Sequence, residues 1–190
     1  SDDSEMQYTL TTPCTAEELA KLRAGDTVLL SGVVYTARDQ AHKRMLEALD
    51  NGEPLPFPLE GSAIYYVGPT PERPGEVIGS AGPTTSGRMD AMSPRLLDLG
   101  NKVMIGKGKR DAAVKEAVRR NGAVYLAALG GAGALMAKSV KTLEVIAWPD
   151  LGCEAVRRLT VEDMPLPVIL DAHGGDLYES GPEAYKTSGC

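Results

Sequence analysis

Apolar side chains recur every three or four residues in several stretches of the chain, which is the spacing of an amphipathic helix. The first of these stretches opens with a capping box, in which Thr15 is followed three positions later by Glu18. Asp39 is suited to cap the start of the next one. We expect helices at 15–23, from Asp39 to about 51, around 89–97 with a restart at Ser93-Pro94, at 111–120, and after a glycine-rich turn within 130–138.

Other stretches are short, apolar and rich in β-branched or aromatic residues, as is typical of strands. The run 26–37 is interrupted at Ser31-Gly32, so it is either one strand with a break or two strands. We expect strands at 8–12, 26–37, 63–67, 77–78, 102–105, 123–128, 143–148, 156–161 and 168–170, followed by a turn at 173–176 that suits a hairpin. Strands alternate with helices in the centre and dominate both ends, which predicts an α/β fold with a mixed sheet and a β-rich portion. We find no internal linker and treat 1–190 as a single domain.

Composition narrows the class of protein. The net charge of -6 argues against general nucleic-acid binding, although basic residues gather locally in 102–110. The longest apolar stretch, 123–135, is broken by glycines and is shorter than the roughly 20 residues that a membrane span needs. Residues 1–7 lack the pattern of a signal peptide. We therefore expect a cytoplasmic protein that does not span a membrane.

Cysteine and histidine are too sparse to suggest a metal site within this chain. The three cysteines, Cys14, Cys153 and Cys190, are widely spaced, and the only histidines are His42 and His173. Their spacing matches neither a disulfide framework nor a known metal-binding pattern.

Two glycine-bearing loops, 78–88 and 104–109, each follow a short apolar run and precede a predicted helix. Small residues let backbone N–H groups approach a ligand, and a helix start adds partial positive charge, so such loops suit an anion. Upstream, Arg38 lies at the start of a predicted helix, where a cation is unfavourable for the helix dipole. Either Arg38 has a task other than helix stability, or it is a surface residue paired with a nearby acid.

Three further motifs superficially resemble a phosphate loop, a dinucleotide-binding loop and an acid–base pair, but each has a simpler explanation. Residues 106–109 lack the Ser or Thr of a phosphate loop, and 130–133 lacks the spacing of a dinucleotide fingerprint. Asp171 and Asp176 are explained by turn chemistry.

What is left is a set of cations and hydroxyls that could hold a small dicarboxylate through charge-assisted hydrogen bonds. Its members are Arg38, Thr84, Thr85, Arg88 and Lys107. The set contains no strong acid, base or metal ligand, so the chain resembles half of an active site.

At these positions the sequence carries five ordered motifs. They are Arg38-Asp39-Gln40-Ala41-His42, the stretch 82–89, Gly106-Lys107-Gly108, Leu129-Gly130-Gly131 and the stretch 171–176. Together they strongly resemble the C-terminal domain of class I fumarases, which also occurs as the separate beta subunit of two-subunit fumarate hydratases and L(+)-tartrate dehydratases. The resemblance covers about residues 9–177.

The resemblance implies a swivelling β/β/α domain that closes over a catalytic [4Fe-4S] cluster. In the family the cluster is held by three cysteines of another domain or of an alpha subunit, and its free iron acts as a Lewis acid toward the substrate hydroxyl. The implied function is that of the beta subunit of a hetero-oligomeric hydro-lyase, which interconverts fumarate and L-malate with its cluster-bearing alpha partner. One alternative is dehydration of L-tartrate, and another is a stand-alone, non-catalytic anion-binding module.

By similarity, Arg38, Arg88 and Lys107 bind the substrate carboxylates, with Thr84 and Thr85 beside them. The family implies a proton-transfer role for Thr84, although an alcohol is a poor base unless nearby cations lower its pKa. The alternative is that Thr84 only donates a hydrogen bond to a carboxylate. Many relatives have Lys-Gly-Asn-Arg where this chain has Lys107-Gly108-Lys109-Arg110. Lys107 aligns with the family lysine, but Lys109 leaves open which of the two faces the substrate.

Overall fold

The computed structural model describes residues 6–69, 74–79, 82–128 and 133–180. Within these ranges, seven strands form one mixed sheet in the order β1-β2-β3-β4-β5-β7-β6. In chain order the elements are β1 (Gln7–Thr11), α1 (Ala16–Leu19), β2 (Thr27–Thr36), α2 (Asp39–Asp50), β3 (Ala63–Tyr65), the 3-10 helix η1 (Ser86–Met89), α3 (Ser93–Asp98), β4 (Val103–Gly106), α4 (Ala112–Asn121), β5 (Val124–Ala127), α5 (Gly133–Lys138), β6 (Val140–Ala147), the 3-10 segment η2 (Pro149–Glu154), β7 (Val156–Leu170) and α6 (Leu177–Ser180). The expected α/β class with a mixed sheet is confirmed.

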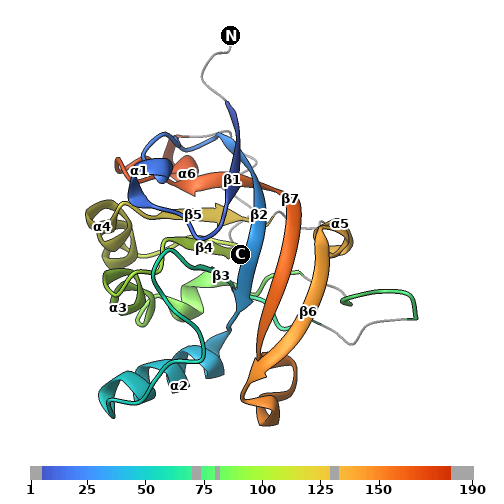
Figure 1. The fold of residues 1–190 in the computed structure, drawn as a ribbon. Helices are drawn as coiled ribbons and strands as arrows, with labels where there is room; N and C mark the ends of the chain where they lie inside the picture. Colours follow the sequence, from blue (N-terminus) through green and yellow to red (C-terminus); the bar gives the residue numbers. More distant parts are fainter. Residues whose placement is uncertain (1–5, 70–73, 80–81, 129–132, 181–190) are drawn as a thin grey trace.

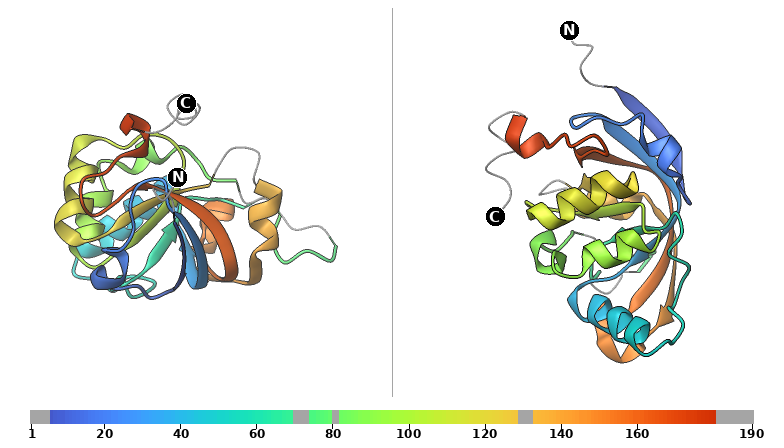
Figure 2. Two further views of the ribbon diagram at one scale, coloured as in Figure 1. Left: turned by 90° about the horizontal axis from the view of Figure 1, so that it is seen from above. Right: turned by 90° about the vertical axis from the view of Figure 1, so that its left-hand side faces the viewer.

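The sheet closes on itself. Strands β1 to β5 are parallel to one another, whereas β7 is antiparallel to β5, β6 and β2. Because β7 pairs with both β5 and β2, the strands β2, β3, β4, β5 and β7 form a closed circuit. Long strands β2, β7 and β6 run side by side in Figure 1, and helices α2, α3 and α4 stack along the other side of the molecule (Figure 2, right).

Two hydrophobic clusters cover the two faces of the central strands. Along β3, Ala63 and Tyr65 belong to one cluster, while Ile64 packs in the other together with Met45 of α2. Strands β4 and β5 alternate in the same way and are buried at every position. This explains why these strands are apolar throughout in the sequence rather than alternating with polar residues.

Strand β2 is continuous, which decides between the two interpretations of the run 26–37. Its register with β7 shifts between Leu30 and Gly32, as expected for a β-bulge. Gly32 has φ +106°, and a Cβ there would lie 3.1 Å from the backbone nitrogen of Thr12. The break in the sequence pattern therefore marks a bulge and not a turn.

Strand β7 is also continuous, so the prediction of two separate strands at 156–161 and 168–170 was wrong. Pro165 and Pro167 lie between those two segments and pair with β2. The backbone N–H of Val168 donates to Asp26 O of the neighbouring β2 edge at 2.8 Å. Successive backbone N–H groups of a strand point to opposite sides, so the backbone nitrogens of residues 165 and 167 point away from β2. A proline at these positions therefore removes no hydrogen bond between β7 and β2.

Several smaller predictions need correction. The expected strand at 77–78 is a bend, and α1 is shorter than the predicted 15–23, although its Thr15 and Glu18 capping box is present. The turn at 173–176 forms, but it leads through a single antiparallel bridge between Leu170 and Asp176 into α6, so among the described residues the expected hairpin does not form. Of the glycine-rich turn expected before α5, residues 130–132 lie outside the described ranges. In the part of the chain that the structure describes, no helix has both the length and the apolar character to cross a membrane.

Candidate anion-binding site

The residues predicted to bind an anion gather at the carboxyl ends of parallel strands β2, β3 and β4. Arg38 follows β2 by two residues, and Lys107 comes directly after β4. Thr84 joins the same edge through its backbone N–H, which donates to the carbonyl of Tyr66, the residue after β3, at 2.8 Å. Carboxyl ends of neighbouring parallel strands lie at one edge of a sheet, so three separate segments of the chain meet there.

The loop after β4 is paired with the segment that carries the two threonines. Thr85 and Lys107 form an isolated parallel bridge, and the backbone N–H of Ser86 donates to Lys107 O at 2.8 Å. Gly106 permits this approach, because a Cβ at that position would overlap Ser86 Oγ and lie 2.8 Å from Tyr66 Cδ2. Lys107 is half-buried within this pairing, whereas Lys109 is exposed.

Arg38 and Arg88 meet at one carboxylate. Asp39 Oδ2 lies 2.9 Å from Arg88 Nε, and Asp39 Oδ1 lies 3.8 Å from Arg38 Nε. The Arg88 side chain is 55% exposed, whereas those of Arg38 and Asp39 are 22% and 24% exposed. The two guanidinium groups therefore share one side of the molecule, as a common substrate site requires.

The start of α2 differs from the prediction that Asp39 caps it. Arg38 occupies the N-cap position without a side-chain cap bond, and Asp39 is the first helical residue. Glu154 of η2 supplies the missing acceptor: its Oε1 accepts from the Gln40 backbone N–H at 2.9 Å, and its Oε2 lies 3.9 Å from Arg38 Nη2. Arg38 thus lies beside two acids, so the interpretation as an arginine near acidic partners also describes its surroundings.

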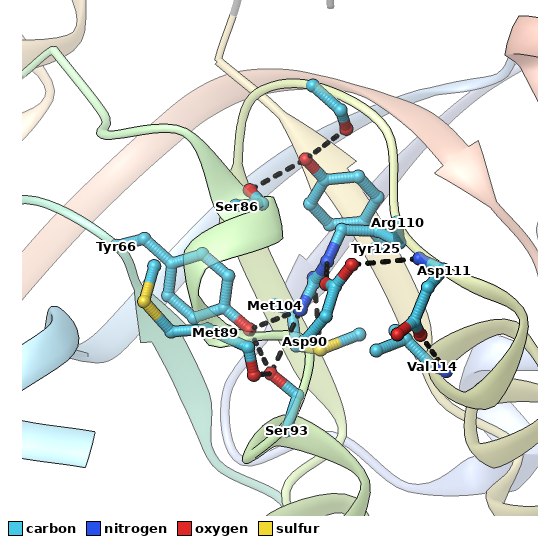
Figure 3. Close-up of polar contacts among 11 residues, drawn as sticks. Tyr66, Ser86, Met89, Asp90, Ser93, Met104, Arg110, Asp111, Val114 and Tyr125 are labelled. Carbon is cyan, nitrogen blue, oxygen red and sulfur yellow. Dashed lines mark hydrogen bonds and ion pairs between the residues drawn. The ribbon is translucent and has the colours of Figure 1, made fainter. Parts of the chain in front are cut away.

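Beneath these loops lies a fully buried arginine (Figure 3). Arg110 Nε donates to Asp90 Oδ1 at 2.6 Å, and its Nη2 donates to Ser93 Oγ at 2.9 Å. The guanidinium carbon lies 5.2 Å from the ring centroid of Tyr66 and 4.8 Å from that of Tyr125, which are cation–π distances. Burial acts to lower the pKa of Arg110, but the tyrosines and Asp90 more than offset it, so the pKa is raised and the group stays charged.

The same cluster fastens the loop after β4. The Tyr125 hydroxyl donates to Gly108 O at 2.8 Å and lies 2.7 Å from Ser86 Oγ, and the other Asp90 oxygen accepts from the backbone N–H of Asp111 at 2.9 Å. The Arg110 cluster, namely Tyr66, Asp90, Ser93, Arg110 and Tyr125, therefore ties the Arg88 segment to the Lys107 loop. Sequence reasoning missed this cluster, because Arg110 is one of several basic residues in 102–110 and no local pattern sets it apart.

His42 is buried against the same tyrosine layer. Its ring lies edge-on to Tyr66 with centroids 5.3 Å apart, and its Nδ1 lies 3.0 Å from Arg38 O. Burial lowers the pKa of His42 to about 4, so the imidazole is neutral at pH 7. Because a carbonyl oxygen only accepts, Nδ1 carries the proton.

The histidines and cysteines of the described residues lie apart from one another in the structure. Within the described ranges no three His, Cys, Asp or Glu side chains are grouped so that they could hold a metal ion. Cys14 is buried, and its burial raises the pKa of the thiol to about 11, away from the thiolate form that binds metals. Cys153 is exposed, and Cys190 lies outside the described ranges.

Comparison with known proteins shows the family of the chain. The model of the family described as fumarase C-terminus matches residues 1–181. The chain belongs to this family.

Relatives fall into two groups by length. A putative L(+)-tartrate dehydratase subunit beta of Methanocaldococcus jannaschii is 41% identical over 92% of this chain and 92% of its own length. Fumarate hydratase 2 of Leishmania major is 40% identical over 85% of this chain but only 29% of its own length. Fumarate hydratase class I, aerobic, of Escherichia coli K12 is 37% identical over 85% and 30%, respectively. The chain thus spans less than a third of the fumarate hydratases and most of the tartrate dehydratase subunit.

Proposed function

We propose that this chain is the beta subunit of a hydro-lyase that interconverts fumarate and L-malate together with a partner subunit. The observation that carries the proposal is the meeting of Arg38 and Arg88 at one carboxylate, beside the Lys107 loop at the ends of parallel strands. Two planar guanidinium groups and a lysine can bind both carboxylates of a small diacid. The names of the relatives support the same class of reaction.

Within the proposal, each side chain has a separate task. Arg38 and Arg88 bind carboxylate oxygens, and Lys107, which is half-buried and bridged to Thr85, adds a third positive charge. Thr84 lies beside the substrate, held by its backbone bond to Tyr66. It either transfers a proton with the help of those cations or donates a hydrogen bond to a carboxylate.

The partner completes the site. The cations described above bind and orient a diacid but do not activate water, so the reaction needs a group from outside this chain. The proposal therefore includes a [4Fe-4S] cluster held by three cysteines of an alpha subunit, a hetero-oligomer and a cytoplasmic location. The match along nearly the whole of a tartrate dehydratase beta subunit supports a separate alpha chain.

L-tartrate is the second candidate substrate. It is favoured by two relatives that match over most of their length and are named as L(+)-tartrate dehydratase beta subunits, one of them putative. Fumarate is favoured by the fumarate hydratases, whose identity to this chain is similar. L-tartrate differs from L-malate by one hydroxyl, whereas Arg38, Arg88 and Lys107 are proposed to bind the carboxylates that the two diacids share.

The test is reconstitution. The chain is purified without oxygen, alone and with a partner that carries three cluster-binding cysteines, and both samples are assayed with fumarate, L-malate and L-tartrate. We expect turnover only from the pair. Turnover by the chain alone, or none from the pair with any of these diacids, would contradict the proposal. Diacid binding by the chain alone, with no turnover by the pair, would instead favour a non-catalytic anion-binding module.

A further inference from the structure

A negatively charged side chain lies in the middle of the proposed anion site. Asp39 contacts both arginines that are proposed to bind the substrate carboxylates. A carboxylate at this place repels a dicarboxylate through space, so its presence among these cations calls for a reason.

Helix stability is an incomplete reason. An acid in the first turn is favourable for a helix dipole, and Asp39 is the first residue of α2. However, Glu154 already brings a carboxylate to this helix end, where it accepts the Gln40 backbone N–H at 2.9 Å. Asp39 turns its oxygens to arginine side chains instead, and its Oδ1 and Arg38 Nε are buried without a hydrogen-bond partner among the described residues.

The geometry of Asp39 suits the positioning of two arginines. One oxygen, Oδ2, lies 2.9 Å from Nε of Arg88, and the other, Oδ1, lies 3.8 Å from Nε of Arg38. The arginines come from segments 50 residues apart, one before α2 and one in η1. A contact through Nε leaves the terminal nitrogens of a guanidinium as further donors.

We propose that Asp39 is a positioning residue, which holds Arg38 and Arg88 side by side so that both donate to one small diacid. The inference rests on the proposed function and deepens it. The contact with Asp39 restricts Arg88 more than Arg38, because the Arg88 side chain is 55% exposed and would otherwise sample many rotamers.

If Asp39 competes with the substrate for the arginines, removing its charge changes substrate affinity in the opposite direction. If Asp39 only occupies the arginines until substrate displaces it, then removing its charge strengthens substrate binding. If Asp39 positions them, removing its charge weakens substrate binding even though a repulsive charge has gone. The sign of the change in KM therefore separates the two.

The kinetic test compares Asp39→Asn with Asp50→Asn in the reconstituted pair. Asp50 is a matched control, because it is the last residue of the same helix and pairs with Arg95 at 2.8 Å, at the end of α2 away from the arginine pair. We expect Asp39→Asn to raise KM about tenfold with kcat changed by less than about threefold, as for a lost charge-assisted contact in the bound state. Asp50→Asn leaves both unchanged. A KM for Asp39→Asn that is unchanged or lower overturns the proposal.

A second test needs no turnover. In ¹⁵N-labelled chain alone, the Nε–Hε signals of Arg38 and Arg88 are assigned by Arg38→Lys and Arg88→Lys, and L-malate is titrated in. We expect both signals to shift together in the wild type, and the Arg88 signal to be lost to solvent exchange in Asp39→Ala. Unchanged Arg88 exchange in Asp39→Ala overturns the positioning role. Absence of turnover by the wild-type pair would count against the proposed function. The Nε–Hε signals would still test whether Asp39 positions the arginines, because they are measured without turnover.

Discussion

Arg110 and Asp90 form an ion pair of 2.6 Å in which the arginine side chain is fully buried and the aspartate is 14% exposed. Asp90 comes directly after η1, which carries Arg88, and it also accepts the backbone N–H of Asp111. A charge buried this deeply is stable only while its partner is present. The shape of the proposed site therefore depends on an ion pair whose arginine is shielded from solvent.

Arg110→Met tests this dependence. Methionine fills much of the same space but leaves Asp90 and Ser93 without their donor, so we expect the free energy of unfolding to fall by about 2–4 kcal/mol. Urea unfolding followed by circular dichroism measures the change. Arg95→Met is the control, because it breaks an exposed pair with Asp50, and it should move the midpoint little. Equal stability of the two variants would mean that the buried pair contributes no more than a surface one.

Arg88→Ala separates binding from folding. The side chain is 55% exposed, so its loss should leave the unfolding midpoint and assembly with the partner unchanged. Activity of the reconstituted pair should fall by about 100-fold or more, since a bidentate contact to a carboxylate is lost. Arg119→Ala, which removes another exposed arginine paired with Glu116, should keep full activity. Near-normal turnover by Arg88→Ala would remove this residue from the proposed site.

Gly106→Ala tests the close approach of the two loops. The new Cβ would overlap Ser86 Oγ, so the segment that carries Thr84 and Thr85 has to move, and we expect kcat/KM to fall by about tenfold or more. Gly52→Ala is the control, because Gly52 follows α2 at the end away from the arginine pair and a Cβ there meets no described heavy atom within 4 Å; its φ of +69° makes the substitution a cost to stability and not to kinetics. Steady-state kinetics of both variants in the reconstituted pair checks this. If both variants have wild-type kinetics, the packing at Gly106 does not shape the site.

His42 predicts a pH-dependent stability. Its pKa is about 4 in the folded chain against an ordinary value of 6.5, so between these values the unfolded chain binds the extra proton and the folded chain does not. Stability is then fully present above pH 6.5 and declines as the pH falls toward 4, by on the order of 2 kcal/mol between pH 7 and pH 5. Urea unfolding at both pH values measures the loss. His42→Gln should show a smaller loss over the same interval, and an equal loss in the variant would place the effect on other groups.

Much of the architecture could be predicted because local patterns determine it. Helix α4 has its Asp111 cap and its apolar spacing, and the central strands β3, β4 and β5 are apolar because both faces are covered. The sequence pattern of β7 is interrupted by Pro165 and Pro167, so the pattern predicts two strands. Only the pairing of β7 with β2 shows that these two positions need no backbone N–H on the side that faces β2.

The candidate site could be predicted only in part. The types and order of Arg38, Thr84, Thr85, Arg88 and Lys107 are visible in the sequence, and the structure brings their segments to one edge of the sheet. Their roles stay predictions. The contact between Asp39 and Arg88 joins positions 49 residues apart, and the inward direction of Arg110 follows from tertiary packing, so neither leaves a local pattern.

Closure of the sheet by β2 and β7 also bears on how the protein forms. Thr36 pairs with Arg157, which lies 121 residues later in the chain. During synthesis on the ribosome, one edge of β2 stays unpaired until β7 and so nearly all the described chain has emerged. Pairing between segments this far apart in the sequence slows folding. Newly made chains are therefore vulnerable to aggregation through the unpaired edge of β2, and a chaperone that shields this edge should raise the yield of folded protein.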